Sequence, residues 1–114
     1  MQSHIRVETR HDGTAAVIMV GGELDLASSA ALEEELARVA GSGVARVIVD
    51  LRELEFMDST GLSTLVKAHQ RAEEAGQEFG LVRGPQQVQR LLSLTGVEDR
   101  LTLADSPEEL LSGG

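Results

Sequence analysis

Residues 44–51, with the sequence VARVIVDL, decide the expected fold because they predict a strand that is buried on both faces. Val47, Ile48 and Val49 form an unbroken β-branched run, which is typical of a strand covered by helices in a parallel sheet. With a helix predicted before it and a strand before that helix, this strand completes a crossover unit, which is right-handed by strong preference. An α/β domain is therefore expected.

Two strands are predicted upstream of this unit. Ile5 and Val7 alternate with charged residues, which is the period of a half-buried strand. Asp12-Gly13 is a hairpin turn signal, so the apolar run at residues 16–20 is expected to pair antiparallel with the first strand. Gly21-Gly22 is predicted to end the second strand.

A loop at residues 23–25 and a helix are expected next. Either Ser28 or Ser29 can cap this helix at its N-terminus. The acidic run at residues 33–35 lies near the predicted helix start, where carboxylates suit the helix dipole. These glutamates form either a patch for a partner or a solvated helix face. The apolar face of the helix is expected to consist of Leu32, Leu36, Val39 and Ala40.

Downstream, the same reasoning predicts a helix over residues 59–75, a strand over residues 79–82, and a third helix between Pro85 and Gly96. A short edge strand is expected at residues 101–103. A capping box of Ser106 and Glu109 predicts a last, short helix. The expected architecture is a mixed β-sheet of four to five strands packed with about four α-helices, in one domain spanning residues 1–114 with a core at about 5–112.

The composition excludes several classes of function. The net charge is −9, so the chain lacks the basic surface that binds DNA or RNA, and anionic membranes are expected to repel it. The charge either favours a locally basic partner surface or serves solubility alone. Cysteine is absent, which excludes disulfides and thiolate metal sites. The three histidines show no metal-ligand spacing, so neither a metal nor another cofactor is expected.

The sequence also carries no targeting signal that we recognise. The first ten residues, MQSHIRVETR, lack the apolar segment of a secretory signal. No apolar run approaches the roughly 20 residues that a membrane helix needs. A cytoplasmic location is expected.

The segment at residues 50–62, DLRELEFMDSTGL, is where function is expected to reside. It predicts the end of a buried strand, a loop, and a helix that opens at Asp58 or Ser59. A helix N-terminus presents unpaired N–H groups and partial positive charge, so it accommodates a phosphate. Gly61 has no side chain, which would let a partner approach closely. From spacing alone, however, structural capping is the commoner reason for these residues.

Four short motifs resemble those of one family in the same order. MDSTGL at residues 57–62 resembles the D-S-[ST]-G-L signature of bacterial anti-sigma factor antagonists, which are small stand-alone STAS domains. GELD at residues 22–25 resembles the motif that ends the family's second strand. VIVDL at residues 47–51 resembles the family's central strand. LTGV at residues 94–97 resembles a late L-x-G-[LV] segment. The resemblance spans about residues 5–112 and implies a STAS-type fold.

The resemblance implies a partner-switching protein that is not an enzyme. The unphosphorylated form would bind an anti-sigma factor that is also a serine kinase, and so release a sigma factor for transcription. This kinase would phosphorylate Ser59 and turn binding off, and a metal-dependent serine phosphatase would restore it. The chain is expected to be a monomer when free. The alternative is a STAS binding subunit of another complex, in lipid transport or a stress-sensing assembly.

Roles for individual residues follow from the same resemblance. Ser59 is the expected phosphoacceptor, and Thr60 is a second acceptor, a partner contact or an ordinary first-turn residue. Asp58 either orients the Ser59 hydroxyl or caps the helix. Asp25 either borders the partner surface or serves as a turn residue. Gly61 completes the expected partner-binding set.

Overall fold

Strand β3 lies at the centre of a five-stranded sheet with the strand order β1-β2-β3-β4-β5. The computed structural model describes residues 4–111, so the expected features at residues 1–3 and 112–114 lie outside the described residues. The five strands and four α-helices confirm the predicted α/β architecture. In chain order the elements are β1 (Ile5–Asp12), β2 (Ala15–Leu24), α1 (Ser29–Ala40), β3 (Arg46–Met57), α2 (Ser59–Ala75), β4 (Glu78–Val82), α3 (Gln86–Leu94), the 3₁₀ turn η1 (Val97–Asp99), β5 (Thr102–Ala104) and α4 (Pro107–Leu111).

The sheet is mixed because only β1 runs antiparallel to its neighbour. β1 pairs antiparallel with β2, with Val7 opposite Val20. The pairs β2–β3, β3–β4 and β4–β5 are all parallel, with Val17 opposite Ile48 in the first of them. The carboxyl ends of parallel strands meet at the same edge of a sheet, so the segments that follow β2 and β3 are brought together there.

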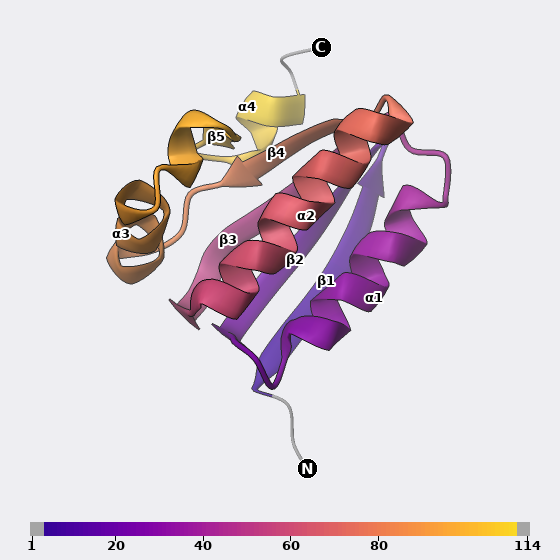
Figure 1. Cartoon of the computed structure of the whole chain (residues 1–114). Coiled ribbons are helices and arrows are strands. Elements are labelled where there is room, and N and C mark those ends of the chain that lie inside the picture. Colours follow the sequence, from indigo (N-terminus) through magenta and orange to yellow (C-terminus); the bar gives the residue numbers. More distant parts are fainter. Residues whose placement is uncertain (1–3, 112–114) are drawn as a thin grey trace.

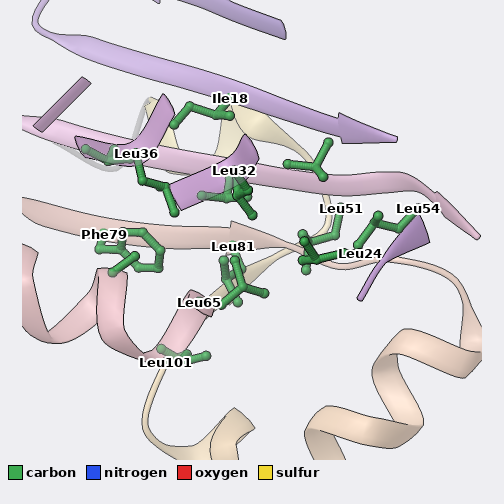
Figure 2. Close-up of a cluster of buried hydrophobic side chains, with 14 of the residues drawn as sticks. Ile18, Leu24, Leu32, Leu36, Leu51, Leu54, Leu65, Phe79, Leu81 and Leu101 are labelled. Atoms are coloured by element: carbon green, nitrogen blue, oxygen red, sulfur yellow. The ribbon is translucent and has the colours of Figure 1, made fainter. Parts of the chain in front are cut away.

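The main core lies between the sheet and helices α1, α2 and α3. Figure 1 shows α1 and α2 side by side on one face of the sheet, running roughly along the strands, with α3 on the side away from α1. Leu32, Leu36 and Val39 of α1 are buried as predicted, whereas Ala40 is exposed. Leu24, Leu51 and Leu54 gather at one end of this core, as Figure 2 shows. The opposite face of the sheet carries α4, where Leu110 and Leu111 pack on Val17, Ile48 and Val82.

Two strands are longer than predicted. We expected β2 to end at Gly21-Gly22 and a loop to follow residue 51, but β2 continues to Leu24 and β3 to Met57. Register shifts between Met19 and Gly21, and again between Gly22 and Glu23, let the two strands stay paired. Glycine is needed at position 22 of the irregular strand. Its φ is +87°, which other residues rarely adopt, and an added Cβ would lie 2.0 Å from the carbonyl oxygen of His4.

The start of α1 also differs from the expectation. Ser28 precedes the helix but makes no side-chain cap hydrogen bond, and the first turn holds no acidic residue. The glutamates at residues 33–35 therefore do not act on the helix N-terminus. Glu33 and Glu34 are exposed, whereas Glu35 is half-buried and accepts hydrogen bonds from Arg38 and Thr9, which lower its pKa to about 2. By contrast, the predicted capping box of α4 is confirmed, with Ser106 and Glu109 bonded reciprocally.

Candidate functional site

The candidate site is the sheet edge where β2 and β3 both end. The backbone N–H of Asp58 donates to the carbonyl oxygen of Leu24 at 3.1 Å, which ties the start of α2 to the end of β2. The sequence predicted a loop at residues 23–25 and another before the helix that opens at Asp58 or Ser59, and this bond brings the two segments together. The site is therefore built from residues that are more than thirty positions apart in the chain.

Asp58 is the N-cap of α2, which settles the two roles left open for it. Its Oδ1 accepts a hydrogen bond from the N–H of Gly61 at 3.0 Å. Its Oδ2 accepts from the N–H of Leu26 in the neighbouring loop at 3.2 Å. One carboxylate thus fixes both the first turn of the helix and the loop after β2. Among residues 4–111, none bonds the Ser59 hydroxyl, so Asp58 does not orient it.

Replacing Asp58 tests this capping role. Asp58→Ala should lower the free energy of unfolding by about 1 kcal/mol, because the Gly61 N–H loses its acceptor. Asp58→Asn keeps an acceptor oxygen on the same stem and should lose only a few tenths of a kcal/mol. Urea unfolding followed by circular dichroism measures both differences. Equal stability of the Asp58→Ala variant and the unaltered protein would show that the cap contributes nothing.

Asp25 serves as a turn residue in this structure. Its Oδ1 accepts hydrogen bonds from the backbone N–H groups of Ala27 and Ser28, each at 3.1 Å. The hydroxyl of Ser28 also bonds this loop, donating to the carbonyl oxygen of Glu23 at 2.7 Å. The Asp25 carboxylate is half-buried and its loop is held in one conformation. Its negative charge nevertheless stays at the edge that carries Asp58.

Ser59 is the first residue of α2 and its side chain is exposed. Because Asp58 performs the capping, the Ser59 hydroxyl has no structural hydrogen bond to maintain within residues 4–111. Thr60 is half-buried, and its carbonyl oxygen accepts a hydrogen bond from the hydroxyl of Thr64 at 3.2 Å. Of the two adjacent hydroxyl groups, that of Ser59 is the more accessible to another molecule.

The structure gives Gly61 a different role from the one expected. We expected its missing side chain to leave room for a partner, but Gly61 is buried and its open side faces the protein interior. An added Cβ would lie 2.6 Å from the carbonyl oxygen of Leu24 and 3.0 Å from Cγ of Met57. Glycine is needed here because the first turn of α2 passes against the end of β2.

Three residues of the site were not found by sequence reasoning. Leu26 and Phe56 are large apolar side chains that remain 77% and 39% exposed beside the start of α2. The side-chain amide of Gln87, in α3, bonds both backbone groups of Met57, accepting at 3.0 Å and donating at 3.1 Å. Met57 pairs with Leu24 of β2 on one side, and on the other side, beyond the end of β4, Gln87 takes the place of a strand and joins α3 to the segment that leads into Ser59.

The described residues show no grouping suited to metal binding. Within residues 4–111, no three His, Asp or Glu side chains are arranged so that they could hold a metal ion. None of the helices in the same range combines the length and apolar character needed to cross a bilayer.

The sequence motifs, the mixed sheet and the capped helix start together define a known class of domain. The family model for the STAS domain matches residues 6–110, and the chain belongs to this family. Over 105 residues it is 33% identical to the anti-sigma-F factor antagonist RsfB of Mycobacterium tuberculosis, a match that covers 90% of this chain and 83% of RsfB. The family predicted from the sequence motifs is thereby confirmed.

Solved structures show the same fold. An anti-sigma factor antagonist from Mycobacterium paratuberculosis superposes with a TM-score of 0.88 at 25% identity, covering 95% of this chain and 92% of that protein. The Bacillus cell fate determinant SpoIIAA in its phosphorylated form superposes with a TM-score of 0.72 at 18% identity, covering 93% of this chain and 96% of SpoIIAA. At that identity, the likeness to SpoIIAA concerns the fold alone.

Proposed function

We propose that this chain is an anti-sigma factor antagonist whose binding is turned off by phosphorylation of Ser59. The observation that carries the proposal is the exposed Ser59 hydroxyl at the N-terminus of α2, which is free because Asp58 caps the helix. The names of RsfB and of the Mycobacterium paratuberculosis protein support the antagonist role. The name of phosphorylated SpoIIAA supports phosphorylation within this fold.

The partner in this proposal is an anti-sigma factor that is also a serine kinase. In its unphosphorylated form the chain binds this factor and so frees a sigma factor. Leu26 and Phe56 provide apolar contacts on the two sides of the site, since each is exposed and lies on a segment fixed by hydrogen bonds to Asp58 or Gln87. A large side chain held on a rigid segment loses little conformational freedom on binding, which favours its use as an interface contact.

Phosphorylation then changes the charge of this contact surface. The kinase transfers the γ-phosphoryl group of ATP to Ser59 Oγ. A new O–P bond forms, the bond to ADP breaks, and the hydroxyl proton passes to a base of the kinase. The phosphate adds a charge of about −1.5 to −2 beside Asp58 and near Asp25. A metal-dependent serine phosphatase restores the hydroxyl by hydrolysis: water attacks the phosphorus, the bond to Ser59 Oγ breaks, and inorganic phosphate leaves. The chain is a substrate and a ligand in this cycle, and the chemistry belongs to its partners.

A binding titration tests the antagonist role. The unphosphorylated chain and candidate anti-sigma kinases from the same host are mixed in a calorimeter, and a one-to-one complex is expected with one of them. Leu26→Ser is the informative variant, because an exposed side chain can be changed without loss of stability. It should weaken the complex about tenfold if Leu26 becomes buried.

The same titration distinguishes the antagonist role from the other roles of STAS domains. Binding to a transporter subunit or to a stress-sensing assembly, together with no binding to any anti-sigma kinase, would assign the chain to a different STAS role. Undiminished kinase binding by Leu26→Ser would leave the function in place but remove Leu26 from the contact surface.

A further inference from the structure

Helix α3 has a composition unlike the rest of this acidic chain. Residues 79–97 contain none of the 19 acidic residues, although the net charge of the chain is −9. Arg83 and Arg90 are the charged residues in this stretch. Arg83 is paired with Asp105 at 2.9 Å, whereas Arg90 has no carboxylate within ion-pair distance among the described residues. Arg90 is therefore available to a carboxylate of another molecule.

The exposed side of α3 also carries apolar surface. Leu94 is 78% exposed and Leu91 is half-buried, so this helix has more apolar surface than packing on the sheet requires. Gln87, Arg90, Leu91 and Leu94 follow one another at helical spacing and form a continuous stripe. Together with Gln86 they line a surface groove of about 420 Å³. We call these five residues the α3 face.

The α3 face is continuous with the candidate site around Ser59. Gln87 belongs to the α3 face and also bonds both backbone groups of Met57, two residues before Ser59. Phe56, 39% exposed, precedes Met57 at the end of β3. Figure 1 shows α3 on the side of the molecule away from α1, so the acidic helix α1 does not border the α3 face. A partner seated at Ser59 can thus extend onto α3.

From this arrangement, and resting on the proposed function, we propose that the α3 face docks an acidic amphipathic helix of the anti-sigma factor. Apolar side chains of that helix cover Leu91 and Leu94, and one of its carboxylates pairs with Arg90. The α3 face has one positive charge, on Arg90, and no negative charge, although the protein as a whole is acidic. Charge complementarity therefore favours an acidic partner segment at this face. The phosphate lies on a different helix, so phosphorylation weakens the complex at Ser59 while the α3 contact still contributes to the residual binding.

Substitutions at two exposed side chains of the α3 face test the proposal and leave the core unchanged. Arg90→Glu and Leu94→Ser are each titrated with the anti-sigma factor that binds the unaltered chain. Each should weaken the complex about tenfold. Arg71→Glu makes the same charge change at an exposed position of α2 and should leave the affinity within twofold. Urea unfolding of all three variants confirms that the fold is kept.

A second measurement uses the phosphorylated chain. Arg90 and Ser59 lie on different helices and no hydrogen bond or ion pair joins them, so Arg90→Glu should weaken the residual binding of the phosphorylated form by a similar factor. Unchanged affinity of Arg90→Glu and Leu94→Ser, with the unaltered chain still bound, would overturn this inference and leave the proposed function standing. No binding by the unaltered chain would overturn the proposed function itself. Self-association that these variants abolish would assign the α3 face to a second copy and also overturn the inference.

Discussion

Phosphorylation of Ser59 is expected to lower the affinity for the anti-sigma factor by about 30-fold to several thousandfold. The phosphate places about −1.5 to −2 charges beside the Asp58 carboxylate, at the edge that also carries Asp25. An unpaired charge within an interface costs on the order of 2–5 kcal/mol, and each 1.4 kcal/mol is about a tenfold change in affinity. The fold itself should be unaffected, because the N-terminus of α2 favours negative charge.

The magnitude is measured by titrating both forms with the same anti-sigma factor. Ser59→Asp adds a single charge and should show a smaller loss than the phosphate. Gln70→Glu supplies the matched control, since it adds one charge at an exposed position of the same helix, three turns from Ser59. That control should bind within twofold of the unaltered chain. Equal losses for Ser59→Asp and Gln70→Glu would mean that net charge, and not the position of Ser59, governs binding.

Gly61→Ala is expected to destabilise the protein by about 2–3 kcal/mol, because the added methyl group overpacks the start of α2. The Cβ would lie 2.6 Å from the Leu24 carbonyl oxygen and 2.7 Å from Leu24 Cγ. That carbonyl oxygen cannot move away freely, since it accepts the hydrogen bond from the Asp58 N–H. The clash must therefore displace the helix turn that carries Ser59.

Gly41→Ala is the matched control for this substitution. Gly41 has a φ of −81°, and the atoms nearest an added Cβ are 3.6 Å and 3.8 Å away, which is ordinary contact. The change should alter the free energy of unfolding by no more than about 0.5 kcal/mol. Urea unfolding of both variants measures the contrast. A Gly61→Ala protein as stable as Gly41→Ala would show that the close contact relaxes without cost.

Local sequence signals predicted most elements of the fold but not the full length of β2 and β3. The run at residues 47–49 predicted the central strand because β-branched residues fit a buried sheet position. Residues 52–57, RELEFM, contain three charged side chains and no β-branched residue, so nothing local indicates a strand. They are extended because the irregular pairing with residues 21–24 of β2 continues, and this pairing is a tertiary effect.

The motif indicated where the candidate site lies, while the contacts within that region depend on packing. Ser59 and Asp58 were identified from the segment that ends β3 and begins α2. The bond between Gln87 and Met57 joins residues 30 positions apart, and periodicity carries no information about such pairs. The role of Gly61 was misjudged because a sequence does not say which way a first-turn residue faces. Leu26 gave one signal, an apolar residue in a polar loop, that reasoning from the sequence did not use.

The most direct test of the central claim is to locate the phosphate after incubation with the kinase and ATP. Peptide mapping by mass spectrometry should find one phosphate, on Ser59, and none on a Ser59→Ala protein that still binds the kinase. Phosphate on Thr60 or elsewhere in the Ser59→Ala protein, at the rate seen in the unaltered chain, would contradict the assignment of the switch to Ser59.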